Sequence, residues 1–209
     1  MALLYSQTRK AGIILRGHEV VLSLPLWVES FLCNSEKVFP SIEERMRLVI
    51  MLSRLNVEHK TGGPFGAGIF EQKSGRLIAV GVNQVEPANC SIAHAEILAI
   101  TFAQHAIGHY DLGAKKETAY ELVTSTEPCV MCLGAICWSG VTSVVCGARD
   151  EDAREIGFDE GPKPKDWICS LESRGIKVVH DVMREHAKTV LTDYPKKGGL
   201  IYNSRRQQT

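Results

Sequence analysis

Two short segments of the chain contain residue types that bind zinc in proteins. They are Ala93-His94-Ala95-Glu96 and Glu127-Pro128-Cys129-Val130-Met131-Cys132. One imidazole and two thiolates, from His94, Cys129 and Cys132, would fill three positions of a tetrahedral Zn²⁺ ion and leave the fourth for water, which is typical of a catalytic site. The carboxylate of Glu96 is the remaining acid–base group of the first segment. We therefore predict a zinc ion that activates water, with Glu96 as the group that carries protons.

Both segments are expected to begin helices. Ser91 is a suitable N-cap for the first helix, and Thr126 could cap the second, with Pro128 in its first turn. Residues three apart share a helix face, so Cys129 and Cys132 can bind one ion. Free N–H groups and the helix dipole at a helix start also favour thiolate over thiol. The sequence thus predicts a metal site between two helix N-termini.

Other interpretations of these segments are a thiol redox pair, a core histidine and a closed structural zinc site. A Cys-x-x-Cys pair alone is consistent with redox chemistry, and a lone histidine on an apolar helix is more often a core residue than a ligand. Neither explains a glutamate two residues after the histidine or a proline directly before the first cysteine. A structural zinc site normally has four protein ligands, and no fourth is evident in the sequence. We therefore favour a catalytic zinc site.

The composition is that of an ordinary globular protein without net charge. The chain has 209 residues, 44% of them hydrophobic, and 24 Lys and Arg balance 24 Asp and Glu. This length favours one domain. The neutral balance argues against a polynucleotide substrate, because nucleic-acid binding normally needs a basic surface. The seven cysteines do not have the spacing of a disulfide framework and no stretch is long enough to span a membrane, so we expect a cytoplasmic protein.

Hydrophobic periodicity and turn residues predict strands that alternate with helices. Ser41-Ile42-Glu43-Glu44 is a capping box that opens a helix through about Asn56. Strands are expected at residues 65–70, 76–82, 120–124, 142–148 and 176–179, and further helices at 92–107, after residue 126, at 166–173 and at 182–194. The strand at 120–124, the helix after it and the strand at 142–148 form a strand–helix–strand unit, which makes the two strands parallel.

The order of the zinc motifs, His-x-Glu followed by Pro-Cys-x-x-Cys, resembles the zinc deaminases of the cytidine-deaminase-like family. The resemblance covers roughly residues 60 to 150 and implies an α/β fold of three α/β/α layers, with a mixed five-stranded sheet and helices on both faces. Four further motifs are similar to the guanine deaminases of this fold: Gly63-Pro64-Phe65, Gly81-Val82-Asn83, Ala135-Ile136-Cys137-Trp138 and Gly157-Phe158-Asp159-Glu160. On this basis we assign residues 38–195 to a zinc-dependent deaminase domain, residues 1–37 to an N-terminal extension that packs on it, and residues 196–209 to a C-terminal tail that closes over an active site.

The resemblance also implies the residues that hold the substrate. The amide of Asn83 would hydrogen-bond the ring, and Phe65 and Trp138 would lie on the two faces of a flat heterocycle. Asp159 and Glu160 would accept hydrogen bonds from the N–H groups of an amino-purine, with Glu160 favoured over Asp159. Taken without the resemblance, Asn83 fits a turn equally well, the aromatic residues fit a core and the acidic pair fits a solvated loop.

Two further contributions to the site are expected from the tail and from the backbone. The resemblance to guanine deaminases implies that the tail closes over a site, either that of its own subunit or that of a partner in a homodimer, and Tyr202 is the candidate residue. The backbone N–H groups of Ala95 and Cys129, at the two helix starts, would stabilise the tetrahedral oxygen formed during the reaction.

These residues together predict hydrolysis of guanine to xanthine and ammonia, with Glu96 passing a proton from the attacking water to the ring and the leaving amine and with Glu160 assisting. The expected cofactor is Zn²⁺, and the expected partners are a small-molecule nucleobase and a second copy of the chain. One rival is a deaminase of another free heterocycle, such as another purine, cytosine, cytidine or an aminotriazine, because the zinc motifs do not select the ring. Another rival is a tRNA adenosine deaminase, which would need phosphate contacts that a neutral chain does not favour.

Overall fold

The computed structural model describes residues 21–35, 37–115 and 117–203, so the first part of the predicted extension and the end of the predicted tail lie outside the described residues. In chain order the elements are α1 (Leu26–Cys33), α2 (Ile42–Glu58), β1 (Gly66–Glu71), β2 (Leu77–Val82), α3 (Ala95–Ile107), β3 (Tyr120–Thr126), α4 (Val130–Ser139), β4 (Ser143–Ala148), α5 (Asp150–Glu155), α6 (Trp167–Glu172), β5 (Lys177–Val179) and α7 (Arg184–Lys196). Among the helices of these ranges, none is long and apolar enough to cross a membrane.

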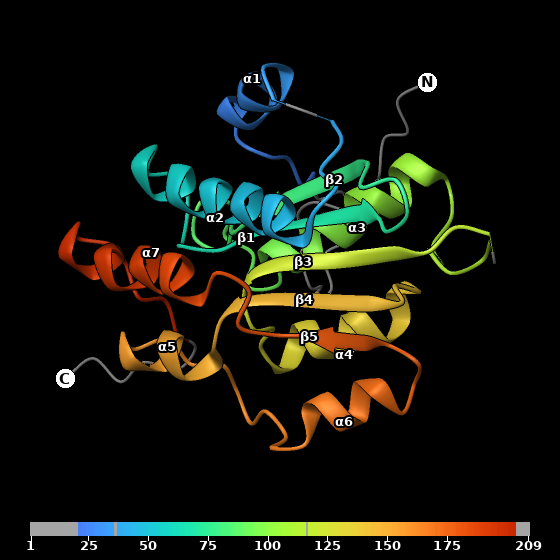
Figure 1. The fold of residues 1–209 in the computed structure, drawn as a ribbon. Helices are drawn as coiled ribbons and strands as arrows, with labels where there is room; N and C mark the ends of the chain where they lie inside the picture. The colour runs from blue at the N-terminus through green and yellow to red at the C-terminus, as the bar shows by residue number, and fades with distance from the viewer. Residues whose placement is uncertain (1–20, 36, 116, 204–209) are drawn as a thin grey trace, which may run out of the picture.

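The strands form one mixed sheet in the order β2-β1-β3-β4-β5 (Figure 1). Strand β1 is antiparallel to β2 and β3, whereas β3, β4 and β5 run parallel to one another. The predicted strand–helix–strand unit is therefore confirmed, because β3, α4 and β4 follow one another and β3 pairs with β4 in parallel.

Helices cover both faces of the sheet and form two hydrophobic cores. One core contains residues of α2 and α7, and the other contains residues of α3, α4 and α6 (Figure 1). Neighbouring strand residues alternate between them: Leu122 and Val144 belong to the second core, while Val123 and Val145 belong to the first. This alternation follows from the pleat of a strand buried on both faces. The predicted three-layer α/β/α fold with a mixed five-stranded sheet is confirmed.

The N-terminal end of α2 is fixed to the sheet by a cap and by a buried ion pair. The predicted capping box is present, since Ser41 Oγ accepts from Glu44 N at 3.2 Å and Ser41 N donates to Glu44 Oε2 at 2.8 Å. Arg45 Nη1 lies 2.6 Å from Glu121 Oε1 of β3, with both side chains less than a tenth exposed. Arg45 also donates to Phe39 O at 2.7 Å. These contacts hold α2 against β3, the strand that leads to the zinc motif.

The helix starts predicted for the two zinc motifs were wrong by a few residues. The N-cap of α3 is His94 and that of α4 is Cys129, both with an extended backbone, whereas Ser91 and Thr126 cap neither helix. Thr126 is the last residue of β3, because its pairing with Ala148 of β4 continues the parallel ladder to this point. Before His94, the backbone bond from Gln84 N to Ala93 O, at 2.9 Å, holds the chain in a loop. The ligands at both helix starts are therefore cap residues.

Helix α1 lies in the predicted N-terminal extension, where no helix was expected. It has only eight residues and one fully buried side chain, Val28, which is 1% exposed and packs in the core beside α2. So short a helix has too few buried positions to produce a hydrophobic period, which explains why the sequence did not reveal it. The expectation that this extension packs on the domain agrees with the position of Val28.

Candidate active site

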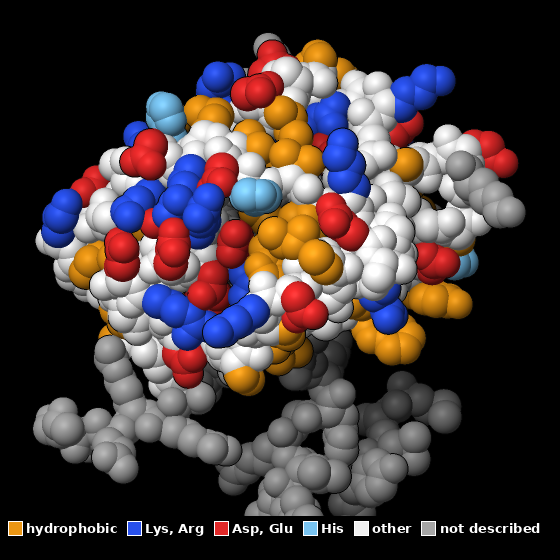
Figure 2. All heavy atoms as spheres, turned by 60° about the horizontal axis from the view of Figure 1, so that its bottom comes forward, with side chains coloured by type: hydrophobic (Ala, Val, Ile, Leu, Met, Phe, Trp, Pro, Cys, Tyr) orange, Lys and Arg blue, Asp and Glu red, His pale blue; other side chains and the backbone are white. Residues whose placement is uncertain are grey.

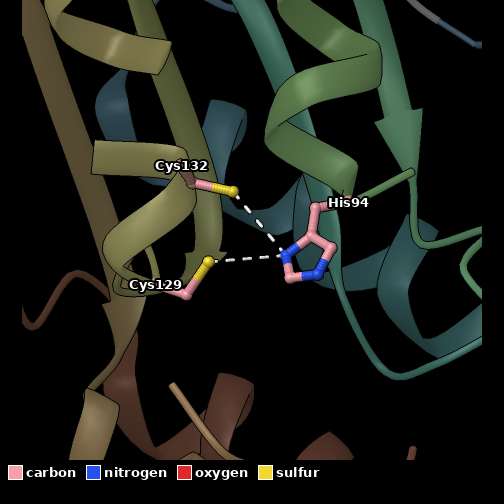
Figure 3. Close-up of side chains that lie close together, drawn as sticks. All are labelled: His94, Cys129 and Cys132. Atoms are coloured by element: carbon pink, nitrogen blue, oxygen red, sulfur yellow. Dashed lines mark hydrogen bonds between the residues drawn. The ribbon is translucent and has the colours of Figure 1, made fainter. Parts of the chain in front are cut away.

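The three predicted ligands lie together in the fold. His94 Nδ1 is 3.5 Å from Cys129 Sγ and 3.7 Å from Cys132 Sγ (Figure 3). All three ligand atoms lie within 4.8 Å of one another. A tetrahedral ion with Zn–S bonds of about 2.3 Å and a Zn–N bond of about 2.0 Å places sulfur and nitrogen about 3.5 Å apart. The donor set also balances the ion, because two thiolates and a neutral imidazole give no net charge with Zn²⁺. These residues therefore fit a zinc ion.

Two helix starts converge on this triad. His94 precedes α3, and Cys129 precedes α4, with Cys132 in its first turn, so the imidazole and both sulfurs face one another across the gap between the two helices (Figure 3). The first N–H groups of each helix have no intrahelical acceptor and favour negative charge. A hydrogen bond from Cys132, followed by the influence of His94, lowers the pKa of the Cys129 thiol to about 4. The thiolate needed as a ligand is thus favoured before metal binds.

Glu96 lies beside the triad in the first turn of α3. It is 6% exposed, its Oε2 is 3.5 Å from Cys132 Sγ, and its Oε1 accepts from Thr124 Oγ1 at 3.3 Å. Burial, together with the negative charge of Cys129, raises the pKa of Glu96. The position agrees with the predicted proton carrier. Thr124 of β3 was not identified from the sequence, since a threonine inside a strand gives no local sign of a catalytic neighbour.

A cavity of about 440 Å³ opens onto His94, Cys129 and Glu96. Its volume is within the usual range of small-molecule sites. Phe65, Phe158 and Tyr202 form an aromatic wall in which Phe158 makes edge contacts with both partners, at ring-centre distances of 5.0 Å to Phe65 and 5.2 Å to Tyr202. Phe65 thus occupies the predicted place, and Phe158 is an additional wall residue. Flat apolar walls of this kind suit an aromatic heterocycle.

The loop after α5 brings Asp159 and Glu160 to the cavity. Glu160 is 7% exposed, and its carbonyl accepts from Val130 N of α4 at 3.1 Å, which ties the loop to the zinc helix. Burial raises the pKa of Glu160 to about 8, and the negative charges of Cys129 and Glu96 add to this effect. The side chain of Asp159 is 60% exposed and accepts from Gly161 N at 2.9 Å within its own loop. The buried Glu160 is therefore the better placed of the two to meet a substrate.

Asn83 follows β2 and lies behind the aromatic wall, 1% exposed. Its Oδ1 accepts from Gly63 N at 3.4 Å and from Val85 N at 3.3 Å. Its Nδ2 has no hydrogen-bond partner among the residues that the structure describes. A Cβ on Gly63 would lie 3.0 Å from Tyr202 Oη and 3.2 Å from Asn83 Oδ1, so a larger residue would displace these side chains by a few tenths of an ångström. Asn83 is not among the residues around the cavity, whereas Tyr202, which lies close to the same point, is one of them. The buried amide donor of Asn83 is therefore next to the cavity wall.

The start of the C-terminal tail lines the cavity of the same chain. Tyr202 and Asn203 are both wall residues. Asn203 Nδ2 donates to Gly157 O at 2.9 Å, and its Oδ1 accepts from Asp159 N at 2.9 Å, so one amide joins the tail to the acidic loop. Tyr202 was expected here, whereas Asn203 was not, because an asparagine near a chain end carries no signal of a distant loop.

Glu127 is a second wall residue that the sequence did not identify. Its Oε2 is 2.9 Å from Lys163 Nζ and accepts from Asp150 N at 3.2 Å, and the side chains of Glu127 and Lys163 are 9% and 6% exposed. Lys163 Nζ also lies over the Trp167 ring, 4.3 Å from its centre. Because Glu127 stands two residues before Cys129, this buried pair holds the zinc motif in place.

Like Asn83, two more of the predicted substrate residues have no side chain among those around the cavity. Trp138 is 81% exposed and is not among the residues around the cavity, so the prediction that it stacks on the ring in its own subunit was wrong. The physical reason is distance along α4, since nine residues at 1.5 Å per residue carry Trp138 about 13 Å from Cys129. Ala95 is buried as the first residue of α3, where its N–H has no intrahelical acceptor, but its side chain does not line the cavity.

Comparison with known proteins places this site in a family. The model of the cytidine and deoxycytidylate deaminase zinc-binding region matches residues 40–148. Guanine deaminase from Bacillus subtilis is 38% identical over 144 residues, which are 69% of this chain and 88% of that protein. A solved structure of guanine deaminase from Nitrosomonas europaea is 46% identical with a TM-score of 0.82, covering 87% of this chain and 98% of that one. A structure of NE0047 in complex with 2,6-diaminopurine is 48% identical with a TM-score of 0.81, covering 89% and 97%.

The triad predicts one zinc ion per chain, which should depend on Cys129. We expect Cys129→Ser to lose most of its zinc, because a hydroxyl replaces a thiolate ligand at a soft site. Elemental analysis of the purified protein measures the metal content. Cys169→Ser, which changes an exposed cysteine, is the control and should retain the ion. Full zinc content in Cys129→Ser would contradict the assignment.

Proposed function

The chain belongs to the cytidine and deoxycytidylate deaminase zinc-binding family, and we propose that it catalyses the hydrolytic deamination of guanine to xanthine and ammonia. The observation that carries this proposal is an aromatic cavity that opens onto two residues of the zinc-ligand triad, His94 and Cys129, and onto a buried glutamate. Guanine deaminases with identity over most of this chain support guanine among the possible amino-bearing rings.

A zinc ion held by His94, Cys129 and Cys132 would make water a nucleophile at neutral pH. Glu96, 3.5 Å from Cys132 Sγ, stands where it can accept a proton as the water oxygen bonds to the amino-bearing ring carbon. It gives that proton to the adjacent ring nitrogen. It then moves a second proton, from the new hydroxyl to the amino group, which leaves as ammonia. One guanine and one water thus give one xanthine and one ammonia.

The free base is held by groups from separate elements. Phe65 packs against the ring, and Asn83 donates its unpaired Nδ2 hydrogens to a ring acceptor. Tyr202 closes over the bound base. The N–H groups of Ala95 and Cys129, at the starts of α3 and α4, stabilise the oxygen of the tetrahedral carbon.

The choice of guanine is assigned to the acidic loop. Guanine presents neighbouring N–H donors beside the amino-bearing carbon, and Glu160 is buried at the cavity wall as an acceptor for them. A ring without those donors leaves this carboxyl group buried and unpaired, which disfavours its binding. Asp159, exposed at the mouth, contributes less.

A tRNA adenosine deaminase is the less favoured alternative. The tail residues Tyr202 and Asn203 form part of the cavity wall, which suits a free base better than a nucleotide within a loop. On the face drawn in Figure 2, Lys and Arg side chains alternate with Asp and Glu and do not form an extended basic surface. Binding of RNA would require such a surface.

We also propose that the protein is a cytoplasmic homodimer. All seven cysteines are unpaired, which supports a reducing compartment. The exposed Trp138, beside the half-buried Ala135 and Cys137 on α4, supports a dimer contact on this helix. In this arrangement Trp138 acts in subunit association.

Glu96→Gln should retain zinc and lose guanine turnover, because the amide keeps the shape of the side chain but cannot accept and return a proton. We expect kcat to fall at least about 100-fold, as for other general acid–base groups. Ammonia release is measured for guanine, adenine, cytosine, cytidine and aminotriazines with both proteins. A Glu96→Gln rate above a tenth of the wild-type rate would show that Glu96 is not the proton carrier. Faster ammonia release from another compound of the panel would refute the proposal that guanine is the substrate.

Glu160→Gln should reduce kcat/KM for guanine by about 10- to 100-fold, since an amide replaces the buried carboxyl group that pairs with the N–H groups of the ring. The matched variant Asp159→Asn makes the same chemical change at the neighbouring position and should have a smaller effect. Steady-state kinetics of both variants decide between the two carboxylates. The reverse order of effects would assign the substrate contact to Asp159.

Trp138→Glu should convert a dimer into a monomer, because a charge cannot be buried at an apolar contact without a partner. Light scattering coupled to size-exclusion chromatography measures the mass. Leu26→Glu, at an exposed position of α1, is the control and should leave the mass unchanged. A monomeric wild-type protein, or a dimeric Trp138→Glu variant, would contradict this assignment.

A further inference from the structure

We propose that Trp27 of helix α1 is a positioning residue for Asn83, acting through a chain of hydrogen bonds that passes through Thr61 and Asn56. The proposal rests on the proposed function, in which Asn83 binds the base. It gives the segment before the family match, which begins at residue 40, a part in substrate binding.

Helix α1 contacts the C-terminal end of α2, whose C-cap is His59. The Trp27 ring stacks on the His59 ring, with centres 5.2 Å apart and planes 10° from parallel. Val28, the next residue, is buried in the core beside α2. Stacking and burial hold the indole in one orientation, with its N–H directed to Thr61, 34 residues away in the sequence.

The hydrogen bonds that start at Trp27 run in one direction. Trp27 Nε1 donates to Thr61 Oγ1 at 2.9 Å, and an indole N–H can only donate. The hydroxyl of Thr61 therefore acts as an acceptor toward Trp27 and keeps its single hydrogen for another group. That hydrogen goes to Asn56 Oδ1, at 2.8 Å. A longer contact, at 3.3 Å, joins the same hydroxyl to Asn56 O. The indole thus favours the arrangement in which the oxygen of the Asn56 amide faces Thr61.

The amide of Asn56 is fully buried, and its other end supports the substrate wall. Its Nδ2 uses both hydrogens, donating to Gly63 O and to Asn83 O at 2.9 Å each. If this amide turned over, its oxygen would face two carbonyl oxygens and its NH₂ would face the Thr61 hydroxyl. Two buried carbonyl groups would then lose their donor from Asn56. The Trp27–Thr61 pair therefore stabilises the one orientation of Asn56 that fixes residues 63 and 83.

Gly63, which Asn56 holds through its carbonyl group, is one of two residues whose backbone N–H groups hold the Asn83 side chain. Gly63 N donates to Asn83 Oδ1, and Val85 N donates to the same oxygen. Both bonds are long, at 3.4 Å and 3.3 Å, so the position of the backbone decides whether they persist. With Oδ1 held, the unpaired Nδ2 keeps the direction in which it meets a substrate. Loss of the Trp27 bond should therefore weaken base binding more than the chemical step.

The test compares variants that remove one bond at a time. Trp27→Phe keeps a ring on His59 but has no N–H, and Thr61→Val removes the hydroxyl with little change in shape. We expect each to raise KM for guanine by about three- to tenfold, the effect of one lost neutral hydrogen bond, with kcat within about twofold of wild type and with full zinc content. Thr61→Ser restores the hydroxyl and should have a KM close to that of wild type. Leu26→Ala, at an exposed position of the same helix, should not change KM.

The double variant Trp27→Phe/Thr61→Val separates positioning from general stability. Because Trp27 acts through Thr61, its KM should equal that of Thr61→Val alone. The proposal would be overturned if the fold increases in KM of the two single variants multiplied in the double variant, or if KM did not change in Trp27→Phe. It would also be overturned if the variants lowered only kcat and the melting temperature. A wild-type protein without guanine turnover would refute the proposed function instead. In that case KM of the Trp27 and Thr61 variants is measured with the base that the substrate panel identifies. The same outcomes then support or overturn the role of Trp27.

Discussion

The convergence of three ligand atoms at two helix starts is the constraint on which the rest of the structure depends. His94 and Cys129 are 35 residues apart in sequence, and yet Nδ1 and Sγ lie 3.5 Å apart. The parallel pairing of β3 with β4 sets where α4 begins, and the loop after β2 sets where α3 begins. Both ligands are cap residues with an extended backbone, so the imidazole and the sulfurs meet in the space between the helix ends. A catalytic zinc geometry therefore needs both halves of the sheet.

Three buried carboxyl groups surround this site, and each is accommodated in a different way. Glu127 is neutralised by Lys163 at 2.9 Å. Glu96 accepts from Thr124 and lies against the ligand sulfur, where it can exchange protons. For Glu160, burial raises the pKa to about 8, so this group keeps a proton more readily than an exposed glutamate. Burial of a carboxyl group is costly unless it is paired or protonated, and these three solutions separate a structural role from a catalytic and a substrate-binding one.

Segments outside the core of the family complete the walls of the cavity. The tail contributes Tyr202 and Asn203, and the Asn203 amide joins the tail to the acidic loop through two hydrogen bonds. Helix α1 is connected to the loop that precedes Gly63 by the hydrogen bond from Trp27 to Thr61. The zinc motif supplies chemistry that many amino-bearing rings could undergo. We propose that selection of one ring falls to residues from these flanking segments and from the loop at Glu160.

By itself, the sequence determined the zinc ligands, Glu96, the capping box of α2 and the strand–helix–strand unit, because each depends on spacing within a few residues or on a local hydrophobic period. The alternation of strands and helices indicated an α/β protein, and the resemblance to the zinc deaminases implied its three layers. Only the tertiary structure decided that Trp138 lies outside the cavity, that Glu127 pairs with Lys163 and that Trp27 is hydrogen-bonded to Thr61. The two hydrogen-bonded pairs join residues more than thirty positions apart in the sequence. Trp138 is separated from the zinc ligands by the length of α4. Their contacts follow from how whole elements pack, which no local pattern of residue types specifies.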